Sequence, residues 1–268
     1  MSFRKRFPTA MILLAILFSI LQWAPPAAFF CFVQIVIVMA LVEFYNLAGK
    51  KKLRPRPAVG ILAALLISAS FFLKAFPFEI ALFGVLLLSG LYFLIVFDTV
   101  EKVMAFPAAF AVTIFGPVYI SFTLNHLYLL QAERGPLVLY FFLGVIFLGD
   151  TGGYLFGKLI GQHKMTPIAS PNKTWEGSVG GLAFACLGAL AAQRLFLNQI
   201  GPGQAALCGV LVHAVAQISD PLESLFKRAV GVKDSSNILP GHGGVLDRID
   251  SLILAAPFFY YYLRYFWK

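Results

Sequence analysis

The side chains whose types and spacing could do chemistry lie between residues 149 and 251. Seven of the chain's 12 acidic residues fall there, namely Asp150, Glu176, Asp220, Glu223, Asp234, Asp247 and Asp250. Lysines, arginines and glycine-rich turns are interspersed among them. Carboxylates that converge with basic side chains are how proteins hold magnesium together with a triphosphate. No cluster of cysteine and histidine suggests zinc, so the pattern predicts a site for a phosphorylated ligand and a hard cation.

The first stretch is Gly149–Gly157, in which Asp150 directly follows the unbroken apolar run 137–148. An ionisable group at such a depth is costly, and it is a functional hypothesis by default. The alternative is a helix-end carboxylate that pairs with Lys158 or another base. The neighbouring glycines would let a helix or a ligand approach the backbone closely.

The second stretch, residues 170–181, reads Ser-Pro-Asn-Lys-Thr-Trp-Glu-Gly-Ser-Val-Gly-Gly. Pro171 interrupts the chain, and Thr174 can cap a helix that follows. A helix N-terminus beside Lys173 favours a phosphate group. The alternative is a capped transmembrane helix with a lysine that sets topology. The expected substrate contacts are Ser170, Asn172, Lys173 and Thr174.

The third stretch, residues 219–250, holds most of the charged groups. Asp220, Glu223 and Lys227 are spaced i, i+3 and i+7, so they share one helix face. Pro221 suits the first position of a helix, which predicts a break at Asp220. Asp247 and Asp250 are three residues apart at a helix start.

Acids are well tolerated at a helix N-terminus, which is the alternative to a metal-binding role for Asp247 and Asp250. Just before them, residues 240–244 form a Pro-Gly-His-Gly-Gly turn that could wrap a nucleotide. His242 in that turn is read as either a structural or a substrate-facing residue. The five remaining acids are expected to be ordinary loop or helix-end residues: Glu43, Glu79, Asp98, Glu101 and Glu133.

The composition predicts that a membrane positions these stretches. Hydrophobic residues make up 60% of the 268 and charged residues only 12%, whereas a soluble domain carries about 25% charged residues. A spanning helix needs about 20 mostly apolar residues. Nine stretches qualify, and they predict an all-α integral membrane protein: 8–24, 26–48, 57–76, 78–97, 105–125, 136–160, 175–197, 203–229 and 250–267.

The distribution of charge gives these spans an orientation. Most of the 21 lysines and arginines fall on one set of alternate connections, which the positive-inside rule assigns to the cytoplasm. The N-terminus is therefore expected to be cytoplasmic, and so are the three chemical stretches. The net charge of +9 is attributed to topology and lipid headgroups, and no nucleic-acid partner is expected.

The organisation follows from where the polar groups lie. Residues 1–135 are predicted to form a lipid-facing scaffold, and residues 136–268 a catalytic region, in one integrated bundle.

The connection between 57–76 and 78–97 is so short that those two helices should form a hairpin. Gly177 and Gly181 form a small-xxx-small pair, which is typical of helix packing.

Taken together, the motifs resemble the phosphatidate cytidylyltransferase family. The resemblance is carried by residues 170–177, by Lys227-Arg228 and Lys233-Asp234, and by residues 240–250 that end in Asp247-Arg248-Ile249-Asp250. It implies that CTP and phosphatidic acid give CDP-diacylglycerol and pyrophosphate with magnesium as cofactor. It also implies a homodimer in the cell's inner membrane. The chain departs from the family pattern at Ser219, Pro221, Asn172 and Ile168, and at Ser235-Ser236.

The resemblance implies roles for single residues. The expected catalytic residues are Asp220, Lys227, Arg228, Asp247, Arg248 and Asp250. Of these, the expected magnesium ligands are Asp220, Asp247 and Asp250. Further substrate contacts are expected at Asp150, Glu223, Lys233, His242, Gly243 and Gly244, in addition to the four of the second stretch.

Three other functions fit parts of the pattern. A CTP-dependent polyprenol or phytol kinase would release CDP instead of pyrophosphate. A transporter would use Asp150 and Asp220 as relay residues in broken helices. A structural scaffold would tolerate mutation of the acids with little effect beyond stability.

Overall fold

The computed structural model describes residues 3–238 and 243–267, and the all-α prediction is confirmed apart from one short hairpin. The chain divides into two compact units. Unit 1 comprises residues 1–128 and 229–248, and unit 2 comprises residues 129–228 and 249–268. The predicted division at residue 135 concerns function rather than compactness, and it stays a prediction.

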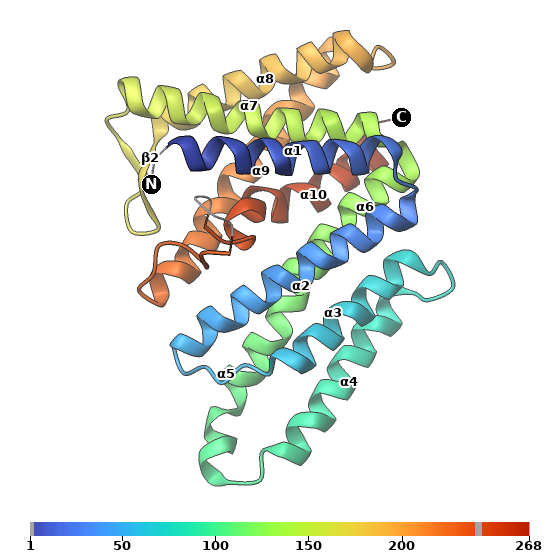
Figure 1. Cartoon of the computed structure of the whole chain (residues 1–268), viewed down its shortest axis with the longest axis vertical. Helices are drawn as coiled ribbons and strands as arrows, with labels where there is room; N and C mark the ends of the chain where they lie inside the picture. Colours follow the sequence, from blue (N-terminus) through green and yellow to red (C-terminus); the bar gives the residue numbers. More distant parts are fainter. Residues whose placement is uncertain (1–2, 239–242, 268) are drawn as a thin grey trace. The chain divides into compact units, whose positions relative to one another are not determined.

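The helices of unit 1 come from the first half of the chain (Figure 1). They are α1 (Phe3–Trp23), α2 (Pro26–Lys50), α3 (Pro57–Phe72), α4 (Phe78–Val96), α5 (Val100–Gly116), the π-helix η1 (Pro117–Phe122) and the start of α6 (Thr123–Arg134). Unit 2 holds the end of α6, then α7 (Pro136–Ile160), β1 (Lys164–Thr166), β2 (Ser170–Thr174), α8 (Trp175–Phe196), α9 (Pro202–Ala229) and most of α10 (Leu246–Phe266).

Proline sets several of the helix starts. Pro26, Pro57 and Pro136 occupy the first positions of α2, α3 and α7. Proline suits this position because its φ is already helical and the first amides of a helix lack intrahelical acceptors. Gly135 precedes α7 with a φ of +83°, a conformation that glycine adopts without strain. The prolines therefore divide the apolar sequence into separate helices.

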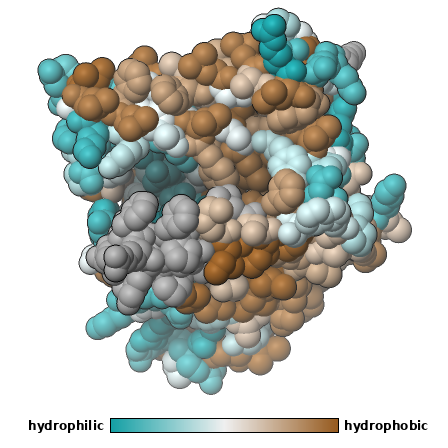
Figure 2. Space-filling model, turned by 45° about the horizontal axis from the view of Figure 1, so that its top comes forward, coloured by the Kyte–Doolittle hydropathy of each residue, from teal (hydrophilic) through white to brown (hydrophobic). Residues whose placement is uncertain are grey.

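In the part of the chain that the structure describes, six segments are long and apolar enough to cross a membrane: α2, α4, the continuous run 100–134, α7, α8 and α9. Each of the nine predicted stretches falls on a helix, but α3 has only 16 residues. The count of nine spans and the cytoplasmic N-terminus therefore stay predictions. Figure 2 shows apolar residues over wide areas of the face turned to the viewer, as expected of a protein in lipid.

Within unit 1, α3 and α4 pack as the predicted hairpin (Figure 1). A buried polar network ties α3 to η1 and α6. Ser68 Oγ lies 3.0 Å from Ser121 Oγ, and Asn125 Nδ2 donates to Ser68 Oγ at 2.9 Å. In lipid such groups must find partners inside the protein, so this network fixes the alignment of the three segments.

Within unit 2, α7 and α8 lie side by side (Figure 1). Glycines make this contact possible. A Cβ on Gly152 would lie 2.5 Å from Phe184 Cβ and 2.8 Å from the carbonyl oxygen of Gly180, and one on Gly177 would lie 2.8 Å from the carbonyl oxygen of Gly153. Gly181 is similarly close to the backbone of Gly149. The packing role predicted for the glycines of α8 is confirmed.

The predicted break at Asp220 is wrong, because α9 continues without interruption through Pro221 to Ala229. Inside a helix, proline removes one backbone hydrogen bond, and its ring crowds the carbonyl of the residue four positions earlier. Transmembrane helices accommodate proline when neighbouring groups satisfy the carbonyl that loses its partner. Asp220 therefore lies on a continuous helix, which gives its side chain a fixed direction.

Candidate functional site

The polar groups of unit 2 gather where β2 meets α9. Lys173 Nζ lies 2.7 Å from Asp220 Oδ2, and the two side chains are 27% and 33% exposed. Ser224 Oγ donates to Asp220 Oδ1 at 3.4 Å, one helical turn further along α9. The second and third stretches of the sequence are thus brought together by an ion pair that is accessible from outside.

The hairpin that presents Lys173 is held at its base by α8. Thr174 caps α8, since its hydroxyl accepts from the amide of Gly177 at 3.2 Å. Glu176 accepts from the amides of Gln162 and His163 at 3.1 and 3.2 Å. The capping prediction for Thr174 is confirmed, while its role as a substrate contact stays a prediction. Glu176 closes the hairpin.

Asp150, on α7, interacts electrostatically with the Lys173–Asp220 pair. Its charge is attracted by Lys173 and repelled by Asp220. Lys158, the alternative partner, instead lies with Nζ 5.9 Å from the ring centroid of Tyr154. The structure therefore associates Asp150 with the other two motifs rather than with its neighbour in sequence.

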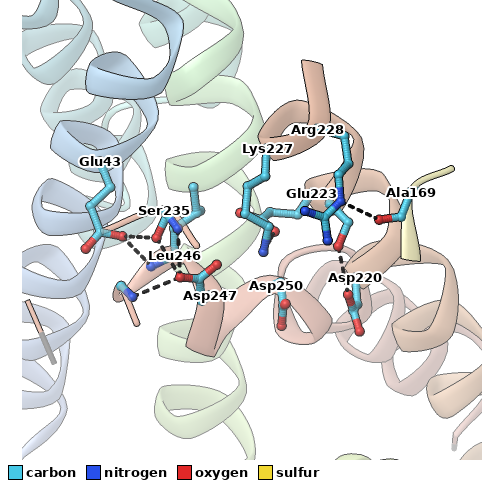
Figure 3. Close-up of polar contacts among 12 residues, drawn as sticks. Glu43, Ala169, Asp220, Glu223, Lys227, Arg228, Ser235, Leu246, Asp247 and Asp250 are labelled. Carbon is cyan, nitrogen blue, oxygen red and sulfur yellow. Dashed lines mark hydrogen bonds and ion pairs between the residues drawn. The ribbon is translucent and has the colours of Figure 1, made fainter. Parts of the chain in front are cut away.

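A second ion pair lies deeper on α9. Lys227 Nζ is 2.5 Å from Glu223 Oε2, and the side chains are only 8% and 1% exposed. These residues are labelled in Figure 3 with Arg228, whose Nε donates to the carbonyl oxygen of Ala169 at 3.3 Å. Arg228 thereby holds the turn between β1 and β2 against α9.

Asp250, on α10, completes the cluster. Its charge is repelled by Asp220 and Glu223 and attracted by Lys227. The buried hydroxyl of Ser219 donates to the carbonyl oxygen of Asp250 and accepts from the amide of Leu254 at 3.2 Å. Ser219 is thus inserted into the first turns of α10, an arrangement that can bend a helix. This departure from the family pattern fixes the backbone that carries Asp250.

The first two substrate contacts predicted on β2 have different exposures. Asn172 is exposed and Ser170 is half-buried, while the carbonyl oxygen of Ser170 accepts from Thr166 Oγ1 at 3.5 Å. Both lie on the strand that presents Lys173. Their roles as substrate contacts stay predictions.

Unit 1 contains the remaining described candidates. Asp247 Oδ2 accepts from the amides of Ser235 and Gly244, both at 2.9 Å, and from Ser235 Oγ at 3.0 Å. Gly243 has a φ of +80°, and a Cβ there would lie 2.8 Å from Asp247 Oδ2. These two glycines therefore allow the chain to approach Asp247. Their proposed contact with a nucleotide is untested.

One residue of this cluster was assigned wrongly from the sequence. Glu43 was expected to be an ordinary loop or helix-end residue, but it is buried in α2 with 1% exposure. It accepts from both Ser235 and Ser236 hydroxyls at 2.7 Å, and from the amides of Val245 and Leu246 at 2.9 Å. Figure 3 shows its contacts with Ser235 and Leu246. The signal was its place inside the apolar stretch 26–48, where an acid is costly.

The other predicted residues are placed more simply. Lys233 and Arg248 are exposed in unit 1. His242 lies outside the described residues. Within the ranges 3–238 and 243–267, no group of three histidine, cysteine or acidic residues is close enough to hold a metal unaided. Magnesium commonly binds through one or two carboxylates plus substrate phosphates. The neighbouring carboxylates of Asp220 and Asp250 fit this mode of coordination.

Comparison with known proteins agrees with this chemistry. The sequence model of the cytidylyltransferase family matches residues 4–266. A protein of Staphylococcus saprophyticus named phosphatidate cytidylyltransferase is 42% identical over 139 residues, which are 52% of this chain and 53% of the relative. Proteins of the same name in Staphylococcus aureus (strain COL) and Staphylococcus epidermidis are 43% identical over 141 residues and 40% identical over 139 residues. The chain thus spans about half the length of the curated relatives it matches.

Proposed function

The chain belongs to the cytidylyltransferase family, and on that premise we propose that it transfers the cytidylyl group of CTP to phosphatidic acid. The products are CDP-diacylglycerol and pyrophosphate. The observation that carries the proposal is the accessible Lys173–Asp220 pair, which is joined by the charges of Asp150 and Asp250. Acids and bases so close together suit a polyphosphate that is bound with a cation.

The reaction needs little covalent help from the protein. An oxygen of the lipid phosphate attacks the α-phosphorus of CTP, a new P–O bond forms, and the bond to the pyrophosphate oxygen breaks. The lipid phosphate is largely ionised at pH 7, so no general base is required. Catalysis then consists of positioning and charge neutralisation. Lys173 would neutralise phosphate charge, while the buried Glu223–Lys227 pair would hold α9 in place.

We further propose magnesium as the cofactor, with Asp220 and Asp247 as its main ligands and Asp250 and Asp150 as further candidates, as the sequence predicts. When bound, the cation supplies positive charge to the phosphates. Asp220 and Asp250 repel each other, so a cation beside them would relieve that repulsion.

The location of the site is part of the same proposal. CTP is a cytoplasmic nucleotide, so the Lys173–Asp220 pair would face the cytoplasm from a multi-pass protein of the inner membrane, as a homodimer. Phosphatidic acid would enter from the adjacent leaflet. Labelling of a cysteine introduced at Ser170 from the outer side of the membrane would contradict this orientation.

The test is pyrophosphate release by the detergent-purified protein with CTP and phosphatidic acid, with and without magnesium. We expect release that requires both, and Asp220→Asn should lower kcat by about 100-fold or more. The control is Asp98→Asn, which removes an exposed acid that is paired with Lys102 at 2.5 Å, on the connection between α4 and α5. Formation of CDP from polyprenols without pyrophosphate would instead identify a kinase.

A further inference from the structure

Glu43 is a buried acid whose four hydrogen bonds all lead to one part of the chain. Its Oε1 accepts from Ser236 Oγ and the Val245 amide, and its Oε2 accepts from Ser235 Oγ and the Leu246 amide. The distances are 2.7 Å to the hydroxyls and 2.9 Å to the amides. A carboxylate has about four acceptor positions, so the side chain is saturated with donors.

Two of these donors explain why an acid is needed. Helix α10 begins at Leu246, and the first amides of a helix have no intrahelical acceptor. The helix dipole makes this end partly positive. Glu43 therefore caps α10 from a different helix, α2, at a sequence separation of 202 and 203 residues. Charge-assisted hydrogen bonds of this kind are among the stronger ones in proteins.

Of the two serine donors, Ser235 connects Glu43 to Asp247. Ser235 Oγ lies 2.7 Å from Glu43 Oε2 and 3.0 Å from Asp247 Oδ2. A hydroxyl has a single proton, so the two carboxylates share it. Ser236 Oγ lies equally close to Glu43 but has no recorded hydrogen bond to Asp247 among the described residues. The adjacent serines thus provide a natural comparison.

The packing leaves little freedom for this arrangement. A Cβ on Gly244 would lie 1.9 Å from Ser235 Oγ and 2.4 Å from Glu43 Oε2. The Gly244 amide also donates to Asp247 Oδ2. Glu43, Ser235 and Gly244 therefore enclose one side of the Asp247 carboxylate.

We infer that Glu43 is a positioning residue for the reaction, which fixes the orientation of the Asp247 carboxylate through Ser235 and through the start of α10. This inference rests on the proposed function, in which Asp247 is a magnesium ligand. Glu43 itself touches no reacting atom. Residues that orient metal ligands commonly change activity by about 10- to 100-fold when they are mutated.

The first experiment compares Ser235→Ala with Ser236→Ala and Glu43→Gln. Each serine variant removes one hydrogen bond to Glu43, so both should lower the unfolding midpoint similarly. We expect Ser235→Ala to lower kcat about 10-fold and to raise the magnesium concentration for half-maximal rate. Ser236→Ala should stay within about twofold of the original chain in both respects. Equal kinetics in the two serine variants would overturn the inference.

Glu43→Gln tests the same positioning of Asp247 by changing Glu43 itself. The –NH2 group of the glutamine would face two of the four donors and could not accept a hydrogen bond from either. One backbone amide at the N-terminus of α10 would therefore lack an acceptor. We expect a loss of kcat of about 10- to 100-fold with the protein still folded, and Glu43→Asp should recover part of it. Activity of Glu43→Gln within twofold of the original chain would contradict the positioning role.

A readout that is independent of turnover separates this inference from the proposed function. Hydrogen exchange at the Gly244 amide reports how firmly Asp247 is held, since that amide donates to it. We expect faster exchange there in Glu43→Gln and Ser235→Ala than in Ser236→Ala. If the original chain released no pyrophosphate, the proposed function would fail. Unchanged exchange would overturn the positioning of Asp247 on its own.

Discussion

Removal of both members of the buried Glu223–Lys227 pair should destabilise the protein by less than the sum of the two single removals. The side chains are 1% and 8% exposed with 2.5 Å between Lys227 Nζ and Glu223 Oε2. Breaking such a pair from one side costs about 3–5 kcal/mol, because it leaves a buried charge uncompensated. We propose the substitutions Glu223→Met and Lys227→Met, alone and together, since methionine has a similar length and no charge.

The structure also predicts which single variant is worse. Asp250 is repelled by Glu223 and attracted by Lys227. Without Lys227, two neighbouring acids lose their shared counter-charge. Without Glu223, Lys227 still has Asp250 nearby. We therefore expect Lys227→Met near the upper end of the 3–5 kcal/mol range and Glu223→Met near the lower end, with a coupling energy in the double variant of about 2–3 kcal/mol.

The assay is thermal unfolding in detergent, followed by the amount of folded fluorescent fusion that survives heating. For a chain of this size, 1 kcal/mol corresponds to about 2–4 °C, so single variants should lose about 6–20 °C. Simple additivity of the two single effects in the double variant would refute the coupling. A single-variant shift below about 2 °C would show that the pair is solvated and has little structural effect.

Three further outcomes test other parts of the structure. Lys173→Gln should lower kcat/KM for CTP at least about 10-fold because it removes the partner of Asp220, and initial rates at varied CTP check this. Gly152→Ala should destabilise the protein by about 1–3 kcal/mol in the same unfolding assay, because the added methyl group would clash with α8. The control is Gly144→Ala on the same helix, where a Cβ meets nothing within 4 Å. This variant should be about 0.5–1 kcal/mol more stable than the original chain. Ser219→Ala should cost about 0.5–1.5 kcal/mol in that assay, and no change there would contradict its insertion into α10.

The sequence predicted the features that depend on local pattern. Apolar runs marked the helices, and the acids and lysines of the second and third stretches do meet as Lys173 and Asp220. Pro221 was misread because the local preference of proline for helix starts was given priority, whereas α9 continues through it as transmembrane helices can when neighbouring groups satisfy the freed carbonyl. The role of Glu43 depends on partners about 200 residues away, and no local pattern encodes such a contact.

The capping of α10 by Glu43 has a consequence for how the chain is made. The acid is synthesised 192 residues before Ser235, and ribosomes add about 5–20 residues per second. For about 10–40 s the nascent helix α2 therefore holds a carboxylate whose donors do not yet exist. Until residues 235–246 emerge, this helix would remain incompletely inserted or accompanied by water or a chaperone. A chain shortened before residue 235 should consequently be recognised and degraded, even though most of its helices are present.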